Sequence, residues 1–348
     1  MTDSERVCAF ESLYAAHKKA RLGKRHKRDV IAFELELAKN LWELKERIES
    51  RTYEAGGYYT FMIHDPKTRQ IQALRYGDRV MQHSLCDNVL TPFFEKRLIY
   101  DNCACRKGKG THFGMKRLTG FMRSYFKEHG TEGWILKLDI HKYFPSIDHG
   151  VLLERLKKVI PARDIYELLE KIVKSYNAES GRGLPMGNQT SQLFALYYLD
   201  PADRLIKEKL RIKYYTRYMD DMVLLCSDKE YLRECLRQIR ELCEGELRLE
   251  LNEKTHIFPL KNGVDYLGWH FYLTETGKVI RKLRQSRKKR LKRRIKVLQQ
   301  EYAAGRKDLE GIKRSIASMQ GHLIHGHTYR LRKKIYGNMV FTKGKTEE

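Results

Sequence analysis

Two adjacent aspartates, Asp220 and Asp221, separate two runs of residues that favour β-strands, and this pattern strongly constrains the fold. Residues 212–217 contain two tyrosines, an isoleucine and a threonine, and residues 222–226 are almost entirely apolar. Such runs around a polar break predict a hairpin with at least one buried strand. Neighbouring carboxylates repel each other and resist burial unless a cation lies between them. The stretch therefore predicts either a Mg²⁺ site or a polar turn with two solvated acids.

The charge of the chain indicates its partner. Its 348 residues include 69 Lys and Arg against 44 Asp and Glu, a net charge of +25. This excess indicates a polyanion, and nucleic acid is favoured over a membrane because no run of 18 apolar residues occurs. The N-terminus lacks a signal-peptide core, so we expect a cytoplasmic protein. Seven scattered cysteines without a C-x-x-C pair favour reduced thiols over a disulfide framework or a zinc site.

A third acid, Asp139, directly follows the apolar run 134–138. A lone charge at the end of a buried strand needs a partner, and a metal shared with Asp220 and Asp221 would provide one. Three such carboxylates suit two-metal phosphoryl transfer, in which one Mg²⁺ activates a 3′-hydroxyl and the other stabilises the pyrophosphate oxygens. Asp148, by contrast, is predicted to cap the helix that follows it.

Two glycine-rich segments are candidates for contacts with phosphates or bases. Residues 106–110 alternate cations with glycines, so the backbone can approach phosphates that Arg106 and neighbouring lysines neutralise. The segment is not a Walker loop, and none occurs in the chain. Residues 181–192 run into a helix whose free N–H groups could pack against a base or a template strand. The alternative for this second segment is an ordinary loop and helix cap.

Other segments predict strands and a basic surface. Residues 58–63 and 71–75 are strand-like and are joined by a turn at 64–69. Residues 266–271 predict one further short strand. Residues 18–28 hold seven Lys and Arg, which form either a solvated helix face or phosphate contacts.

The most basic stretch is 281–296, in which eleven of sixteen residues are Lys or Arg and none is acidic. From Leu291 onward apolar residues recur at helical spacing, at Leu291, Ile295, Leu298 and Tyr302, and a second amphipathic helix follows from Leu309. We expect a helical domain that grips nucleic acid, in preference to helices that lie on a membrane.

Five motifs resemble motifs A to E of reverse transcriptases. In chain order they are Asp139, Gly187-x-x-x-Ser191, Tyr218–Asp221, Lys254 and residues 266–268. The resemblance extends upstream over 75–110 and downstream to the basic helices, and so covers nearly the whole chain. It implies an α+β right-hand polymerase. The implied parts are fingers at 1–130, with the palm starting at about 80–105, a palm at 131–275 with an antiparallel sheet backed by helices, and a helical thumb at 276–348.

The resemblance also implies roles for single residues. Asp139, Asp220 and Asp221 match the ligands of two Mg²⁺ ions, with Mn²⁺ as an alternative, and Lys254 matches a lysine proposed to protonate pyrophosphate. Phe144 matches a steric gate that favours dNTPs over NTPs. The positions implied for nucleotide binding are Arg79, Arg106, Lys109, Phe144, Met186 and Gly187. Those implied for primer and template are Tyr218, Tyr266, Leu267, Gly268, Arg287, Lys288 and Arg290.

The glycine loop bears on the subtype. Group II intron and retron enzymes usually carry Gln-Gly-x-x-x-Ser-Pro, whereas this chain has Met186-Gly187 and Ser191-Gln192. That form resembles the bacterial or phage-encoded enzymes of diversity-generating retroelements, which copy a template-repeat RNA with errors at adenines and act with a basic accessory protein oligomer. The architecture also resembles defence-associated unknown-group enzymes, for which a dedicated structured non-coding RNA is an alternative partner.

We therefore expect a reverse transcriptase that copies an RNA template into cDNA, forming a cDNA/RNA hybrid from dNTPs. A catalytically idle, maturase-like RNA-binding protein is an alternative, and the three acids speak against it. An RNA-dependent RNA polymerase is disfavoured by Phe144. No HNH or RNase H acid pattern occurs, which argues against an intron mobility protein or a retroviral-type enzyme.

Overall fold

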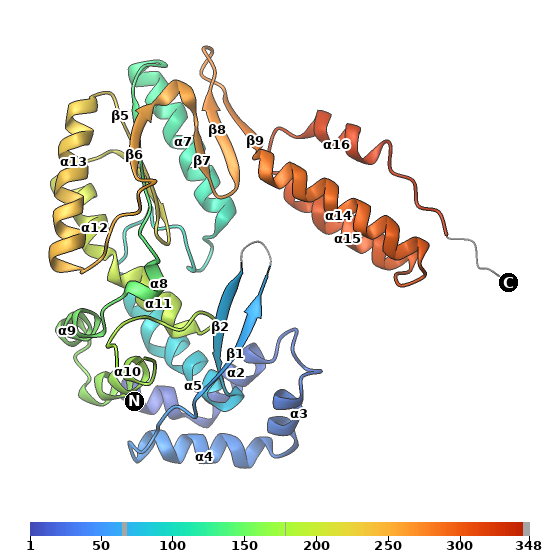
Figure 1. Ribbon diagram of the computed structural model, residues 1–348. Helices are drawn as coiled ribbons and strands as arrows, with labels where there is room; N and C mark the ends of the chain where they lie inside the picture. Colours follow the sequence, from blue (N-terminus) through green and yellow to red (C-terminus); the bar gives the residue numbers. More distant parts are fainter. Residues whose placement is uncertain (65–67, 178, 344–348) are drawn as a thin grey trace.

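The computed structural model describes residues 1–64, 68–177 and 179–343. Within them, helices surround antiparallel sheets that lie one after another along the chain (Figure 1). The predicted α+β class is therefore confirmed. None of the helices in the described ranges combines the length and apolarity needed to cross a membrane.

The N-terminal part is mainly helical and carries one β-hairpin. Its elements are α1 (Asp3–Cys8), α2 (Phe10–Ala20), α3 (Arg28–Leu35), α4 (Leu37–Glu49), β1 (Tyr58–Ile63), β2 (Arg69–Leu74), α5 (Tyr76–Leu85), η1 (Cys86–Leu90), α6 (Thr91–Glu95) and α7 (Thr111–His129). Helix α5 packs against α2, α3 and α4. The pairing of β1 with β2 confirms the two predicted strands, and the predicted turn at 64–69 lies partly outside the described residues.

The central part is built around a four-stranded sheet with the strand order β4-β5-β3-β6. Its elements are β3 (Trp134–Leu138), α8 (Tyr143–Ser146), α9 (His149–Val159), α10 (Arg163–Lys174), α11 (Gln189–Tyr198), α12 (Asp200–Arg204), η2 (Leu205–Lys209), β4 (Tyr214–Tyr218), β5 (Asp221–Cys226), α13 (Lys229–Glu241), η3 (Leu242–Glu246), β6 (His256–Pro259) and η4 (Leu260–Asn262). The predicted cap is confirmed, since the Asp148 carboxylate accepts the Val151 N–H at 3.1 Å at the start of α9.

Both faces of this sheet are buried, which explains the uninterrupted apolar run in β5. Met222 and Leu224 face one hydrophobic core, to which α13 contributes, while Val223 and Leu225 face a second core together with α7. Successive side chains of a strand point to opposite faces, so a strand covered on both sides cannot alternate polar and apolar residues.

The C-terminal part consists of a small sheet followed by helices: β7 (Val264–Tyr266), β8 (Trp269–Leu273), β9 (Val279–Leu283), α14 (Gln285–Ala303), α15 (Leu309–Leu323) and α16 (Tyr329–Tyr336). The prediction of one strand at 266–271 is wrong, because a turn at Leu267 and Gly268 divides it into β7 and β8. The apolar stripe of α14 is buried at Leu291, Ile295 and Leu298, as predicted. Figure 1 shows α14 and α15 side by side, extending away from the central sheet.

Candidate active site

The two adjacent aspartates lie at the tip of the β4–β5 hairpin. Strand pairing ends at Tyr218 and Asp221, which leaves Met219 and Asp220 as a two-residue turn. Met219 has a φ of 55°, a left-handed conformation that costs a residue with a side chain about 1–2 kcal/mol. The predicted hairpin is confirmed, and its strained turn fixes the position of both acids at the end of the sheet.

The third acid is brought to the same place by strand register. Strand β3 pairs with β5, with Leu138 opposite Met222, so the continuing register sets Asp139 opposite Asp221. The Asp139 carbonyl accepts the Asn252 N–H at 2.8 Å, and its own N–H donates to Thr255 Oγ1 at 3.3 Å. These bonds fix the backbone of Asp139 on the side of β3 away from β5.

The three carboxylates interact electrostatically. Burial raises the pKa of Asp220 to about 6, and the charges of Asp139 and Asp221 act in the same direction. Burial also raises the pKa of Asp221, against the opposing effect of Lys137. Raised pKa values mean that negative charge is held here with too little compensation, which a cation would supply.

Lys137 was not among the predicted site residues. Its ammonium forms an ion pair with the Asp221 carboxylate and lies 5.1 Å from the centre of the Tyr266 ring. It precedes Asp139 by two residues in the chain, and this spacing places both side chains on one face of the strand. A single lysine in an otherwise apolar strand, two residues before a candidate ligand, is the signal that could have identified it.

Arg217 is a second residue that the sequence did not reveal, and it supports the turn from inside. Its guanidinium is fully buried, pairs with the equally buried Asp203 of α12, and donates to the Met219 carbonyl at 3.0 Å. A further bond reaches the Leu196 carbonyl of α11, also at 3.0 Å. One side chain therefore connects the acidic turn to two helices.

The donor set suits a hard divalent cation, because carboxylate oxygens are what Mg²⁺ prefers. In the described ranges, however, no group of three or more His, Cys, Asp or Glu side chains is already arranged around a common metal position. Asp221 is directed to Lys137 instead. A carboxylate has two oxygens, so Asp221 can bind an ion through one of them while the other faces Lys137.

Lys254 and Phe144 lie on segments next to Asp139, and the glycine loop contacts the segment of Phe144. The exposed Lys254 belongs to the loop whose Asn252 and Thr255 bind the Asp139 backbone. The Leu184 N–H donates to the Phe144 carbonyl at 2.9 Å, which places the loop that includes Met186 beside α8. Gly187 is exposed with a φ of 119°, and a Cβ there would lie 3.1 Å from Ile71 of β2. Arg79 and Gly187 line one cavity.

The structure contradicts the prediction that Arg106 binds a triphosphate. Its side chain is buried, and all five N–H groups have acceptors: the Glu95 carboxylate and the carbonyls of Glu95, Ile99 and Asn102. Lys109 is similarly engaged, donating to the Tyr100 carbonyl at 2.6 Å. Arg106 therefore has no donor left for a ligand in this arrangement, whereas this hydrogen bond uses only one of the three N–H groups of Lys109.

Of the residues predicted to bind primer and template, some lie in the core and others at the surface. Tyr266 is buried in β7, whereas Leu267 and Gly268 form the turn after it. A Cβ on Gly268 would lie 2.0 Å from Arg287 Cζ, so the guanidinium packs directly on this glycine. Arg287 and Arg290 line a groove of about 420 Å³ between α14 and α15, and Lys288 lies outside this groove. Tyr218 is half-buried at the end of β4, in the β4–β5 hairpin.

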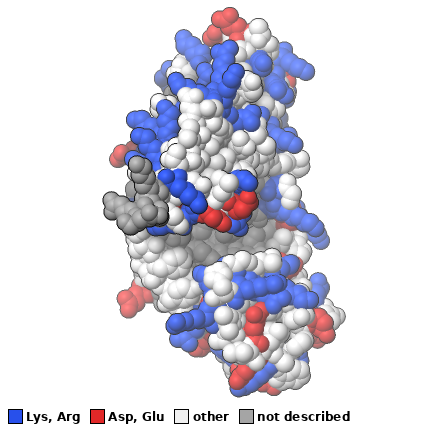
Figure 2. Space-filling view, turned by 90° about the vertical axis from the view of Figure 1, so that its right-hand side faces the viewer, with Lys and Arg blue, Asp and Glu red and all other residues white. Residues whose placement is uncertain are grey.

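The surface charge agrees with a polyanionic partner. Figure 2 shows a hollow across the middle of one face, with Lys and Arg side chains gathered above and below it. Exposed cations contribute long-range attraction to nucleic acid without regard to sequence.

Comparison with known proteins identifies the family. The model of the family "Reverse transcriptase (RNA-dependent DNA polymerase)" matches residues 64–271, a range that includes Asp139, Gly187, Asp220, Asp221 and Lys254. The match covers more than half of the chain, and the protein belongs to this family. The right-hand fold that the motifs predicted is that of its members.

Individual relatives are distant. Protein YkfC of Escherichia coli (strain K12) is 23% identical over 237 residues, which are 57% of this chain and 61% of YkfC. The putative COX1/OXI3 intron 2 protein of Saccharomyces cerevisiae is 24% identical over 95 residues, 25% of this chain and 11% of that protein. The chain thus spans less than two thirds of the curated relatives that it matches.

Solved structures with some similarity include two telomerases. The Candida albicans telomerase, solved with a TWJ fragment of telomeric RNA, superposes with a TM-score of 0.49 at 14% identity, covering 81% of this chain and 55% of that chain. Apo telomerase from Candida tropicalis gives a TM-score of 0.44 at 14% identity, covering 66% and 49%.

Proposed function

We propose that this protein is an RNA-directed DNA polymerase that copies an RNA template into cDNA by nucleotidyl transfer. The observation that carries the proposal is the register that sets Asp139 opposite Asp221 and beside Asp220, within the family's matched range. These three carboxylates would hold two Mg²⁺ ions, or Mn²⁺, which activate the primer 3′-hydroxyl and stabilise the leaving pyrophosphate.

The protein's own residues would position the substrates and neutralise charge at the site. Lys137 compensates the negative charge of Asp221 when no ion does. Phe144, whose backbone carbonyl accepts the Leu184 N–H, would restrict the sugar of an incoming dNTP. Lys254, next to the Asp139 loop, is a proton donor for pyrophosphate.

The basic C-terminal helices give the proposal its nucleic-acid partner. Eleven cations in 281–296 on and around α14 would neutralise the phosphates of an RNA template and of the cDNA/RNA hybrid. We assign 1–130 to the fingers, 131–275 to the palm and 276–348 to the thumb, because the resemblance to reverse transcriptases implies these bounds.

We place the protein in the diversity-generating type, as an error-prone enzyme with a basic accessory protein. Met186, half-buried beside the exposed Gly187, supports this because a thioether cannot hydrogen-bond a nascent base pair as an amide can. The defence-associated type, with a structured non-coding RNA, is the second candidate because the same loop sequence fits it. Sequencing cDNA made by the native enzyme and by Met186→Gln decides whether the loop affects fidelity: an unaltered error spectrum would contradict that role.

Primer extension tests the main proposal. The wild-type protein should extend a DNA primer on an RNA template with dNTPs and Mg²⁺, and Asp220→Asn should abolish extension. RNA binding by both proteins is the control, because the substitution leaves α14 untouched. Absence of product from a wild-type protein that still binds RNA would favour the idle maturase-like alternative.

A further inference from the structure

A patch of basic side chains lies where helix α7 meets strand β9 and the loop between α15 and α16. The turn between β8 and β9 packs directly on α7, since a Cβ at Gly277 would lie 2.5 Å from the ring of Phe126. We call this surface the α7–β9 patch, and its members are exposed or half-buried: Lys116, Arg123, Lys127, Lys278, Arg281 and His327.

Arg281 indicates a ligand most directly. It lies on the same face of β9 as the buried Val279 and Leu283, so its side chain is at the edge of the second hydrophobic core. Its Nε atom is buried, and none of the described residues accepts a hydrogen bond from it. The buried Arg217 has Asp203 for this purpose, whereas Arg281 has no such acid. A buried cationic donor without an acceptor is unfavourable, which indicates an anion at this position.

Further positive charge surrounds Arg281. The His327 N–H donates to the Arg281 carbonyl at 2.8 Å, and the Arg281 N–H donates to His327 Nδ1 at 3.0 Å. Burial lowers the pKa of His327, and the charges of Arg281, Lys278 and Arg123 act in the same direction. Burial and the charge of Arg123 likewise lower the pKa of Arg281. Over the described ranges no carboxylate pairs with any of these four side chains, so their charge is uncompensated.

Helix α7 extends the patch as a row. Lys116, Gly120, Arg123 and Lys127 follow one another at spacings of four, three and four, which places them on one face of the helix. All four are exposed, and the row is about 16 Å long at 1.5 Å per residue. A Cβ at Gly120 would meet nothing within 4 Å, so the helix surface is open between Lys116 and Arg123. Glycine is unfavourable inside a helix, but here it allows a ligand to approach the backbone closely.

The patch is separated from the three aspartates by the length of the central sheet. The Tyr125 hydroxyl of α7 donates to the Glu132 carbonyl at 2.7 Å, just before β3 begins at Trp134. Trp134 pairs with Cys226, at the end of β5, whereas Asp139 and Asp221 lie at the opposite ends of the same two strands. A five-residue strand spans about 16 Å. Arg123 and Lys127 therefore lie at the end of the sheet away from the acids.

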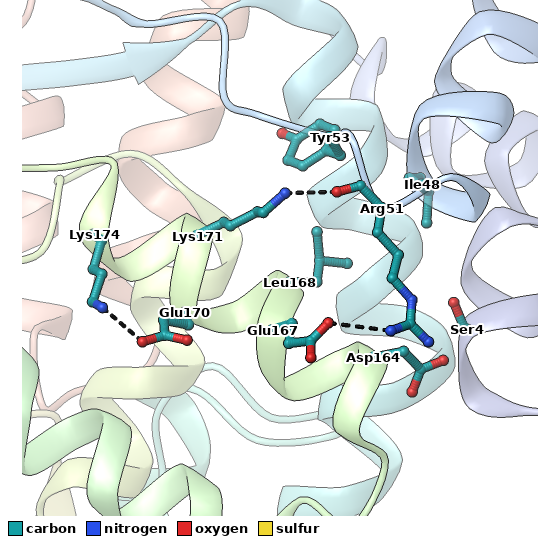
Figure 3. A pocket seen from close by; sticks show the side chains of 10 residues that line it. All are labelled: Ser4, Ile48, Arg51, Tyr53, Asp164, Glu167, Leu168, Glu170, Lys171 and Lys174. Atoms are coloured by element: carbon teal, nitrogen blue, oxygen red, sulfur yellow. Dashed lines mark hydrogen bonds and ion pairs between the residues drawn. The ribbon is translucent and has the colours of Figure 1, made fainter.

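A cavity elsewhere shows the more usual arrangement of surface charge. It has about 420 Å³ and lies between α1, α4 and α10 (Figure 3). Its cations already have partners: Arg51 pairs with Glu167 at 3.4 Å, Lys174 pairs with Glu170 at 2.6 Å, and Lys171 donates to the Arg51 carbonyl at 2.7 Å. The α7–β9 patch thus differs from this cavity in having cations without acids.

We propose that the α7–β9 patch is a second nucleic-acid surface, which binds the sugar–phosphate backbone of a double-stranded RNA stem outside the primer–template site. Cations fixed on a helix and a strand suit a duplex, whose phosphates are held in a regular row and are recognised by shape. Single strands are held largely by stacking on aromatic side chains, and this patch consists of Lys, Arg and one His. Only the identification of the stem as RNA rests on the proposed function, because phosphate contacts do not require polymerase activity.

The test measures binding at both surfaces at once. The full chain is first saturated with a blunt RNA/DNA hybrid that carries one fluorophore, and an RNA hairpin with a second fluorophore is then titrated in, without dNTPs. Anisotropy of each fluorophore reports its own ligand. Arg123→Gln and Arg281→Gln each remove one cation of the patch. Arg51→Gln, from the cavity in Figure 3, removes an exposed arginine that is already paired and is the matched control.

We expect the wild-type protein to bind the hairpin while the hybrid stays bound. Arg123→Gln and Arg281→Gln should each weaken hairpin binding about tenfold and reduce its log–log salt dependence by about one unit, with hybrid affinity unchanged. Arg51→Gln should behave as wild type. Melting temperatures check that the half-buried Arg281 can be replaced, and the exposed Arg123 provides a variant that does not depend on this.

Three results would overturn the proposal. The hairpin could displace the hybrid from the wild-type protein, both variants could bind the hairpin as tightly as wild type, or they could weaken hybrid and hairpin equally, which would make the patch part of the primer–template site. Primer extension by the same proteins is measured separately, so a lack of polymerase activity would not be mistaken for a lack of stem binding.

Discussion

Replacing Arg217 with methionine tests whether the acidic turn depends on the buried pair behind it. Arg217 and Asp203 are both fully buried, and the Tyr215 hydroxyl also donates to Asp203 at 2.6 Å. Methionine fills much of the same volume but leaves the Asp203 charge with only one neutral partner. It also removes the donors to the Met219 and Leu196 carbonyls.

The expected cost is large because the remaining charge stays buried. Removing one member of a buried ion pair costs about 3–5 kcal/mol, a substantial part of the 5–15 kcal/mol by which proteins are stable. Arg237→Met in α13 is the matched control. Arg237 pairs with Glu234 and Glu241, but its side chain is 57% exposed, so its loss should change the free energy of unfolding far less than the loss of Arg217 does.

Urea unfolding followed by circular dichroism gives both free energies of unfolding. The double variant Arg217→Met/Asp203→Asn should recover at least about 2 kcal/mol, because no unpaired charge is left and the asparagine still accepts from Tyr215. A cost below 1 kcal/mol for Arg217→Met, or a double variant as unstable as the sum of its parts, would refute the reasoning.

Three further predictions concern the site and the basic helix. Without divalent ions, the folded protein binds the Asp220 proton more tightly than the unfolded chain, so this group's contribution to stability decreases as the pH rises from about 4 to about 6. Asp220→Asn should therefore be more stable above pH 6, by up to about 3 kcal/mol in urea unfolding, and identical pH profiles would contradict this. Phe144→Ala should increase ribonucleotide incorporation in primer extension; if it does not, the steric-gate assignment is wrong. Lys289→Gln, at an exposed position of α14, should reduce the log–log salt dependence of RNA binding by about one unit, and a sequence-selective loss would instead indicate base contacts.

Arg106 shows where inference from the sequence failed. A cation among glycines has the composition of a phosphate-binding loop, and that composition gave no sign of Glu95. The acid lies on α6, and only the path of the chain between them brings the two together as an ion pair of 2.7 Å. A long charged side chain reaches any of several neighbours, so its partner depends on packing.

The sequence alone determined the local elements and the set of acids. Periodicity predicted the hairpin around Asp220 and the amphipathic α14, because burial on one face of a strand or helix imposes a repeat that can be seen in the chain. Only the tertiary structure decided which charges meet: Lys137 with Asp221, and Arg217 with Asp203. Those contacts join residues far apart in the chain, and no periodic pattern encodes them. They follow from sheet register and helix packing, which depend on the whole fold.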